Sequence, residues 1–178
     1  PGGRAPPLAA VTVPAPHLAY TRNGRFVGGI RPASYGLRVW KRGAHRRAPV
    51  AAVTSGSDKF FLGTDSAPHA AHLKEHAIGC AGCYTALSAL ELYAEAFDTA
   101  GALDTFEAFA SFNGPAFYGL PRNTGTVTLR RQAWTLPESL PFGAPPPKPL
   151  RGGHTVAWQN ADTSHGRKHP RMKNPAWP

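Results

Sequence analysis

The feature that most constrains this chain is a single carboxylate placed directly after a short apolar run. Residues 60–62 are strongly apolar, Gly63 and Thr64 interrupt the run, and Asp65 follows at once. An apolar run bounded by a glycine predicts a short buried strand. The acid at its end has two interpretations. It caps a following turn or helix, or it is a catalytic carboxylate at the C-terminal end of a barrel strand, where such enzymes gather their functional side chains.

The residues around Asp65 also carry a family resemblance. Residues 63–87 contain GTDSAPH, then KE, then GCAGCYTAL. This segment resembles the last barrel strand and loop of dihydroorotase, of the bacterial single-function type within the amidohydrolase superfamily. The likeness continues over residues 23–42 upstream and residues 89–121 and 134–143 downstream, and it covers roughly residues 8–158. A match of this length is far more specific than a short motif.

The resemblance implies an α/β fold, in which this chain is the C-terminal part of a (β/α)8 TIM-type metal-dependent hydrolase barrel plus a C-terminal arm. A complete barrel takes about 250 residues, whereas this chain has 178. We therefore expect only the last two or three barrel units. Residues 1–158 would hold this portion of the barrel with its closing helices and arm, and residues 159–178 would form a basic, disordered tail.

The resemblance also implies a reaction. The family interconverts L-dihydroorotate and N-carbamoyl-L-aspartate, a step of pyrimidine biosynthesis, with a pair of zinc ions that activate water and polarise a carbonyl. Asp65 would be both a metal ligand and the catalytic base that carries a proton from the attacking water to the leaving nitrogen. The other ligands of the family, an HxH pair, a carboxylated lysine and two histidines, would lie upstream. We therefore expect the chain to be inactive by itself.

Three substrate-binding positions follow from the same resemblance. His69 would donate to the substrate carboxylate, although without the surrounding motif an ordinary surface histidine is the simpler interpretation. The main chain of Leu37 and of Ala81 would contact the substrate, because backbone groups satisfy a planar ring amide without adding charge. The expected ligand is therefore a small acidic molecule held partly by backbone groups.

Cys80 and Cys83 form a C-x-x-C pair with two interpretations. Two thiols at this spacing can share a metal ion or form a disulfide. One pair is only half of a structural zinc site, which His72 or His76 would have to complete. The alternative that we favour is a glycine-containing tight loop that brings Ala81 to the substrate.

The chain is strongly basic, with a net charge of +10 and a pI near 10.2. Basic residues gather in residues 22–47 and 148–173, whereas residues 85–107 contain acids and no bases. Such asymmetry can mark a nucleic-acid surface, yet no aromatic stacking platform lies among the basic residues. We favour a solvated basic face. A small nucleic-acid-binding protein and an inactive barrel remnant remain as alternatives to the enzyme, and the resemblance implies a homodimer.

Periodicity predicts the N-terminal elements. Residues 8–13 are expected to form a strand, and residues 39–55 a helix that kinks or ends near Ala48 because Pro49 follows. Residues 84–100 show the strongest helical spacing of apolar side chains, with a glycine placed to end the helix.

Toward the C-terminus the signals are weaker. Residues 104–112 are expected to form a helix, with the Asn-Gly-Pro of residues 113–115 as a break. Strands are expected at residues 126–129 and 155–158. No run of about 18 apolar residues exists, so we expect no transmembrane helix. Two cysteines agree with a reducing compartment, and we expect a cytoplasmic protein.

Overall fold

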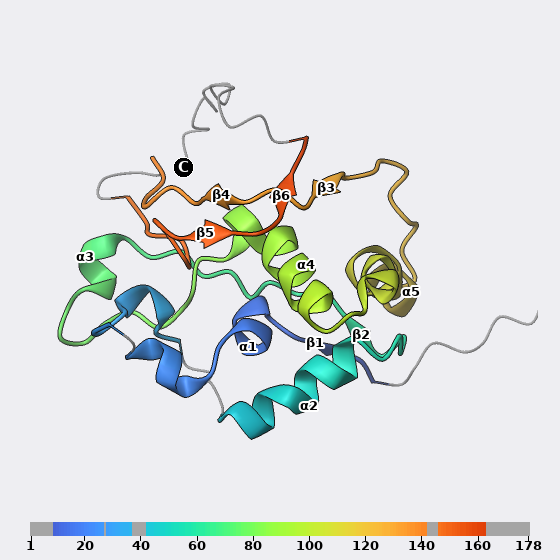
Figure 1. Cartoon of the computed structure of the whole chain (residues 1–178), viewed down its shortest axis with the longest axis horizontal. Helices are drawn as coiled ribbons and strands as arrows, with labels where there is room; N and C mark the ends of the chain where they lie inside the picture. Colours follow the sequence, from blue (N-terminus) through green and yellow to red (C-terminus); the bar gives the residue numbers. More distant parts are fainter. Residues whose placement is uncertain (1–8, 27, 37–41, 142–145, 163–178) are drawn as a thin grey trace, which may run out of the picture.

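The computed structural model describes residues 9–26, 28–36, 42–141 and 146–162 (Figure 1). Its helices and strands are, in chain order, β1 (Val11–Thr12), α1 (Ala15–Ala19), α2 (Gly43–Val53), β2 (Phe60–Phe61), α3 (Ala71–Lys74), α4 (Ala89–Thr99), α5 (Asn113–Tyr118), β3 (Leu129–Arg130), β4 (Trp134–Thr135), β5 (Thr155–Val156) and β6 (Gln159–Asn160). Helix and strand alternate in the N-terminal half, whereas the C-terminal part is made of short antiparallel pairs. None of the helices in the described ranges is long and apolar enough to cross a lipid bilayer.

Strands β1 and β2 lie side by side as a parallel pair. Val11 is opposite Phe60, and Thr12 is opposite Phe61. Parallel neighbours need a long crossover connection, which usually contains a helix. Here the connection runs through α1 and α2, and α2 packs against both α1 and β2. The structure thus contains a β–α–β unit, the repeating element of a β/α barrel, and both strands lie within the predicted strand segments.

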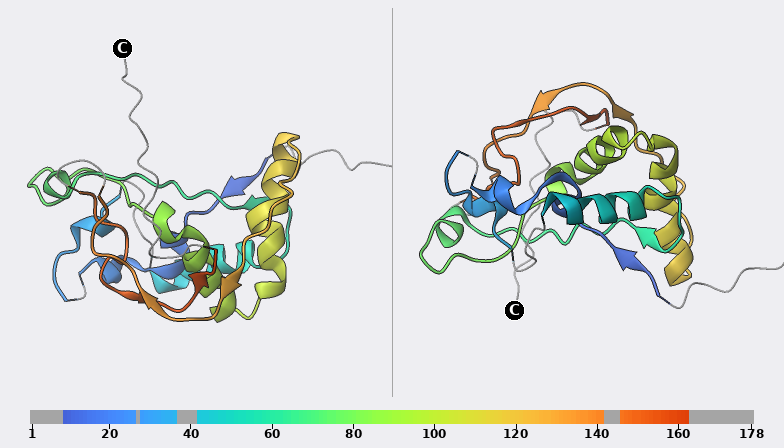
Figure 2. Two further views of the ribbon diagram at one scale, coloured as in Figure 1. Left: turned by 90° about the horizontal axis from the view of Figure 1, so that it is seen from above. Right: turned by 60° about the horizontal axis from the view of Figure 1, so that its bottom comes forward.

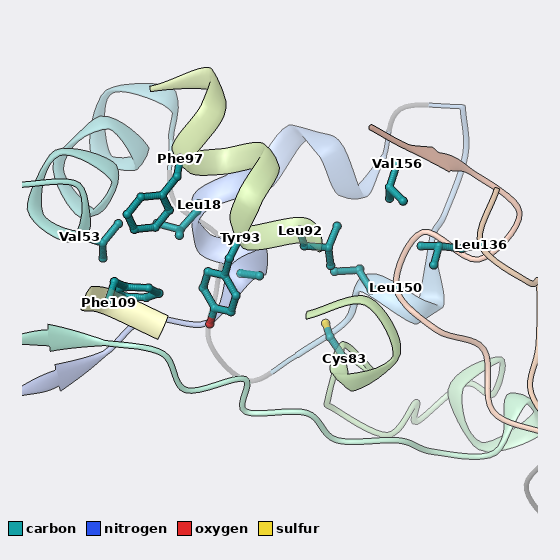
Figure 3. Close-up of a cluster of buried hydrophobic side chains, with 11 residues drawn as sticks. Leu18, Val53, Cys83, Leu92, Tyr93, Phe97, Phe109, Leu136, Leu150 and Val156 are labelled. Carbon is teal, nitrogen blue, oxygen red and sulfur yellow. The ribbon is translucent and has the colours of Figure 1, made fainter. Parts of the chain in front are cut away.

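The hydrophobic core is built around α4. This helix lies between α1, α2 and the parallel pair on one side and strands β5 and β6 on the other (Figures 1 and 2). Tyr93 and Phe97 of α4 are fully buried, and their rings lie 5.4 Å and 5.1 Å from the ring of Phe109 (Figure 3). Burying one large apolar side chain contributes about 1.5–3 kcal/mol. Helix α4 therefore anchors both halves of the molecule.

The helix predicted over residues 84–100 is confirmed in α4, which a 3-10 turn at Ala86–Ser88 precedes. Ala100 forms the C-cap, and Gly101 follows with φ of +68°. A left-handed residue just after the cap is the usual helix stop, and glycine adopts this conformation without a steric penalty.

Helix α2 corrects one prediction. Pro49 lies inside the helix, which continues to Val53, so the helix does not end near Ala48, and the alternative of a kink there stays a prediction. A proline in a helix interior removes one backbone hydrogen bond and costs about 3 kcal/mol. The turn after the proline offsets this cost by packing, because Val53 is buried and Val50 contacts the core cluster. The predicted start of this helix, at residue 39, lies outside the described residues.

The segment 104–118 corrects a second prediction. Residues 103–118 are helical without interruption, first as a 3-10 turn at Leu103–Thr105, then with a π-helical turn at Ala108–Phe112, so the helix expected over residues 104–112 forms. The Asn-Gly-Pro sequence does not break the chain but starts α5. Pro115 therefore lies within a continuous helical segment, shortly after its π-helical turn. Asn113 Nδ2 also donates to Phe60 O at 2.9 Å, which fixes α5 to β2.

The C-terminal arm pairs with itself in two antiparallel ladders. Strand β3 pairs with β6, and β4 pairs with β5. Strand β5 lies within the predicted residues 155–158, whereas β3 shares only Leu129 with the strand predicted at 126–129. Gln159 and Asn160, the first residues of the predicted tail 159–178, pair with β3. Residues 163–178 lie outside the described ranges. The division of the chain at residue 158 stays a prediction.

The acidic side of α4 holds the arm in place. Asp98 forms an ion pair with Arg131 at 2.6 Å, and Glu95 forms one with Arg151. Backbone and indole N–H groups of the arm also donate to α4 carboxylates, including Asn160 N to Glu91 Oε1 at 3.2 Å. Exposed ion pairs contribute little singly. Together they explain why an acidic helix and a basic arm occur in one chain.

Candidate functional site

The parallel pair brings two polar side chains to the same end of the molecule. His17, on α1, comes five residues after β1, and Asp65 comes four residues after β2. The carboxyl ends of neighbouring parallel strands meet at one edge, so the segments that follow them converge there. His17 and Asp65 both line a hollow of about 290 Å³ at this edge. His17 is half-buried, and Asp65 is exposed.

The backbone of Asp65 is in an uncommon conformation. Its φ is +47°, and in the described ranges only Arg151 is another non-glycine residue with a positive φ. Such a conformation costs on the order of 1–3 kcal/mol and is concentrated at functional sites. Helix α3 starts six residues later with Ala70 at its N-cap position, so Asp65 does not cap it. The interpretation of Asp65 as the N-cap of the next helix is therefore wrong for α3.

The neighbours of Asp65 hold it from both sides. Ser66 Oγ accepts hydrogen bonds from the backbone amides of Thr85 and Ala86, at 3.1 Å and 3.0 Å. Thr85 Oγ1 in turn donates to the carbonyl of Thr64 at 3.2 Å. The segment that enters α4 therefore fixes the chain on either side of the carboxylate, and this explains how the strained conformation is maintained.

A buried tyrosine joins the ends of the two strands. The hydroxyl of Tyr93 lies 2.8 Å from Val13 O and 3.1 Å from Gly63 O, and it shares its proton between these carbonyls. In Figure 3 this hydroxyl points out of the core cluster toward the chain below it. Burial raises the pKa of Tyr93 far above its usual value, so the group is protonated at neutral pH. The tyrosine thus sets the distance between the segments that carry His17 and Asp65.

The loop with the C-x-x-C pair forms another wall of the hollow. Ala81, Gly82 and Cys83 line it together with Asp65. Gly82 has φ of +145°, and a Cβ atom on it would lie 2.6 Å from the Cβ of Ala67. Only glycine fits at this position, because real Cβ atoms do not approach one another this closely. The loop therefore passes within contact distance of the chain after Asp65.

The predicted substrate-binding residues are placed as follows. Asp65 and Ala81 line the same hollow. His69 Nε2 lies 3.1 Å from the carbonyl oxygen of Ala81. The His69 ring thus contacts a residue of the hollow's wall but does not itself line the hollow. Leu37 lies outside the described residues, although Gly36 before it lines the hollow.

Sequence reasoning missed His17 as a candidate site residue. It placed every histidine ligand upstream of this chain. The signal was present, since His17 stands a few residues after the strand predicted at 8–13, as Asp65 does after residues 60–62. The pairing of β1 with β2, which sequence periodicity does not reveal, makes the two positions equivalent.

The cysteine pair shows no sign of a metal site. Both thiols are free, and Cys83 belongs to the hydrophobic core cluster. His72 and His76 are exposed. Across the described part of the chain, no three His, Cys, Asp or Glu side chains form a group that could hold a metal ion. The loop interpretation of Cys80 and Cys83 stays a prediction.

Comparisons with known proteins agree on one family, although a scan against models of protein families gave no match. The chain is 67% identical over 152 residues to the dihydroorotase of Variovorax paradoxus, which covers 85% of this chain and 44% of that protein. It is 70% identical over 148 residues to the dihydroorotase of Cupriavidus taiwanensis, covering 83% of this chain and 43% of the relative. The chain thus spans somewhat under half the length of these curated relatives.

Solved structures give the same result for the fold. Dihydroorotase from Saccharomyces cerevisiae, in complex with 5-fluoroorotic acid, superposes with a TM-score of 0.75 and 28% identity over 85% of this chain and 42% of its own. Dihydroorotase from Campylobacter jejuni superposes with a TM-score of 0.74 and 25% identity over 85% of this chain and 44% of its own. By sequence and by fold, the chain is therefore similar to a segment of dihydroorotases that makes up less than half of their length.

Proposed function

We propose that this chain forms part of the active site of a dihydroorotase, which reversibly hydrolyses the cyclic amide of L-dihydroorotate to N-carbamoyl-L-aspartate in pyrimidine biosynthesis. One observation carries the proposal: His17, Asp65 and Ala81 surround a single hollow at the carboxyl edge of two parallel strands. Active sites of β/α barrels lie at this edge. We place the activity in the cytoplasm, in a protein longer than the segment matched here.

The two polar side chains in the hollow fit a zinc ion. Imidazole nitrogen and carboxylate oxygen are both usual zinc ligands, and His17 and Asp65 line the same space. A catalytic zinc site uses three protein ligands, so further ligands would come from outside the described residues. When bound, zinc supplies Lewis-acid polarisation of a carbonyl and a lower pKa for bound water.

Asp65 acts as the base in this proposal. Its carboxylate takes a proton from the water molecule that adds to the ring carbonyl carbon. The bond from this carbon to the ring nitrogen then breaks, and the same proton passes to the nitrogen. General acid–base catalysis needs the carboxylate within hydrogen-bond reach of both atoms. The hydrogen bonds of Ser66 and Thr85, described above, hold the backbone on either side of Asp65.

Ala81 and His69 bind the substrate in this proposal. The backbone of Ala81 pairs with the ring amide. The His69 ring can donate from Nε2 to Ala81 O, at 3.1 Å, so Nδ1 is the nitrogen that remains for the substrate carboxylate. Donating from both nitrogens requires a proton on each of them. The yeast relative was solved with 5-fluoroorotic acid, a carboxylated pyrimidine, and this supports a small acidic ligand.

A chimaera tests the proposal. This chain replaces the matching 152-residue segment of the Variovorax paradoxus dihydroorotase, and conversion of L-dihydroorotate to N-carbamoyl-L-aspartate is measured. We expect activity, and a loss of about 10²-fold or more in kcat for Asp65→Asn, which keeps the shape of the side chain but not its basicity. Asp104→Asn, an exposed carboxylate in a distant turn, is the matched control and should leave kcat unchanged.

The alternatives predict other outcomes. An inactive chimaera that folds would identify the chain as a barrel remnant. An Asp65→Asn variant as active as wild type would remove Asp65 as the base. Affinity for DNA or RNA that falls steeply with salt would instead favour the nucleic-acid-binding alternative, because phosphate contacts release counterions.

A further inference from the structure

Lys74 is a buried lysine that the proposed chemistry does not use. It is the last residue of α3, and 9% of its surface is exposed. Its Nζ donates to three backbone carbonyls, Tyr35 O at 2.8 Å, Cys80 O at 2.8 Å and Gly82 O at 2.6 Å. Lysine is almost never buried unless its charge is compensated. Three carbonyl acceptors match the three donors of an ammonium group.

These carbonyls belong to two segments that are far apart in the sequence and lie on the same hollow. Tyr35 directly precedes Gly36, which lines the hollow. Cys80 and Gly82 stand on either side of Ala81. The amide of Gly82 also donates to Tyr35 O at 2.9 Å. The ammonium group therefore joins two segments of the hollow's wall.

The three consecutive carbonyls of residues 80–82 alternate in direction. Those of Cys80 and Gly82 accept from Lys74, and that of Ala81, between them, lies 3.1 Å from His69 Nε2. Alternation of this kind is a property of extended backbone, where successive groups point to opposite sides. By fixing the outer two carbonyls, Lys74 also fixes the direction of the middle one.

We propose that Lys74 is a positioning residue for the substrate-binding backbone of Ala81. It does not touch the substrate, but its ammonium group holds residues 80–82 against Tyr35 so that Ala81 faces the hollow. Bonds from a charged donor to a carbonyl are roughly twice as strong as neutral ones, which suits a clamp between two loops. The link to substrate rests on the proposed function, whereas the clamp itself stands on the contacts above.

The first arm of the test measures the clamp without activity. In the full chain, the rate at which the aromatic disulfide DTNB modifies Cys80 is compared between wild type and Lys74→Met, which keeps the length of the side chain but not its charge. Cys80 is half-buried on the clamped loop, and Cys83 is buried in the core. We expect Cys80 to react about tenfold faster in the variant, the change that loss of one charged hydrogen bond gives.

Two further variants separate the clamp from general effects of the substitution. Lys59→Met removes an exposed lysine and should leave the Cys80 rate unchanged. Lys74→Arg keeps the charge and the donors, and its rate should lie closer to wild type than that of Lys74→Met. Equal rates in the arginine and methionine variants would overturn the proposal, because packing alone would then explain the site. Lys74→Gln replaces the methionine variant if the latter is recovered unfolded.

The second arm uses the chimaera. Lys74→Met should raise KM for L-dihydroorotate about tenfold with a smaller change in kcat, because a misplaced binding loop weakens substrate binding first. A purely structural role would instead lower the amount of active protein, and thus the apparent kcat, at constant KM, and that result would overturn the positioning role. If the wild-type chimaera is inactive, the proposed function fails, and the thiol rates still decide whether the clamp exists.

Discussion

The hydroxyl oxygen of Tyr93 lies 2.8 Å from the carbonyl oxygen of Val13, a residue 80 positions earlier in the chain. The same hydroxyl reaches Gly63, just after β2. A core helix therefore contacts both strands at the point where the polar segments of the candidate site begin. Stability of the core and geometry of the site depend on the same side chain.

Tyr93→Phe tests this connection. The substitution removes the hydroxyl and leaves two partly buried carbonyls without this donor, so we expect the free energy of unfolding to fall by about 1–3 kcal/mol. Urea unfolding followed by circular dichroism measures the loss. Tyr118→Phe is the control, since Tyr118 is 63% exposed and its hydroxyl is open to water. Equal stability of wild type and Tyr93→Phe would contradict the role of the hydroxyl.

Ionisation of the same tyrosine should make the free energy of unfolding depend on pH. Burial raises the pKa of Tyr93 above the ordinary value of 10.0. Below pH 10 the group is protonated in both states, so its contribution is complete. Above pH 10 the unfolded chain releases the proton and the folded protein retains it, and stability falls by up to about 1.4 kcal/mol per pH unit.

The Tyr93→Phe variant has no hydroxyl to ionise at this position, so it lacks this loss of stability above pH 10. The difference in unfolding free energy between wild type and Tyr93→Phe should therefore narrow as the pH rises above 10. Unfolding curves of both proteins, collected at intervals from about pH 8 to pH 11, check this expectation, which uses the ordinary tyrosine pKa as its threshold. Curves that stay parallel over this range would show that Tyr93 ionises equally in both states.

His17→Ala tests the proposed metal ligand. Loss of one zinc ligand should lower the zinc affinity of the chimaera by at least about 10-fold. Even mutation of a residue that only hydrogen-bonds to a metal ligand lowers metal affinity about 10–100-fold. Zinc content after dialysis against a weak chelator measures the change, and activity should return only at higher added zinc. His72→Ala, at an exposed position outside the hollow, is the matched control. Equal zinc retention in the two variants would exclude His17 as a ligand.

Gly82→Ala tests how closely the loop passes the chain after Asp65. The added methyl group would lie 2.6 Å from Ala67 Cβ, so the loop must move, and we expect KM for L-dihydroorotate to rise. Gly101→Ala also places alanine at a positive φ, but nothing lies within 4 Å of its Cβ position. Both variants carry backbone strain of roughly 1–2 kcal/mol, and only the first should change KM in the chimaera assay.

Sequence patterns predicted those parts of the structure that depend on neighbouring residues. Asp65 was identified because an apolar run, a glycine and an acid follow one another directly. Helix α4 was found because its apolar face repeats at helical spacing and Gly101 ends it. His17 was missed because its relation to Asp65 arises from the pairing of two strands about 50 residues apart, a non-local contact that periodicity does not encode.

Two local rules gave wrong expectations for physical reasons. Pro49 predicted a kink or an end of the helix, and the helix does not end there, because packing of Val50 and Val53 against the core outweighs one lost hydrogen bond. The Asn-Gly-Pro sequence predicted a break, yet Asn113 is bonded to Phe60, and the helical segment continues through Pro115 after a π-helical turn. In both places tertiary contacts override local propensity.

The acidic face of α4 gives the arm a spectroscopic consequence. Trp158 Nε1 donates to Asp98 Oδ2 at 3.1 Å, and Trp134 Nε1 donates to Trp158 O at 2.9 Å. Both indoles lie where the arm contacts α4, so their fluorescence emission should change when this contact changes. Carboxylates make the polar part of this attachment, and dissolved salt weakens that part, whereas Leu136, Leu150 and Val156 of the arm are buried in the core cluster. Tryptophan fluorescence can therefore report how much the carboxylate contacts contribute while the apolar contacts of the arm persist.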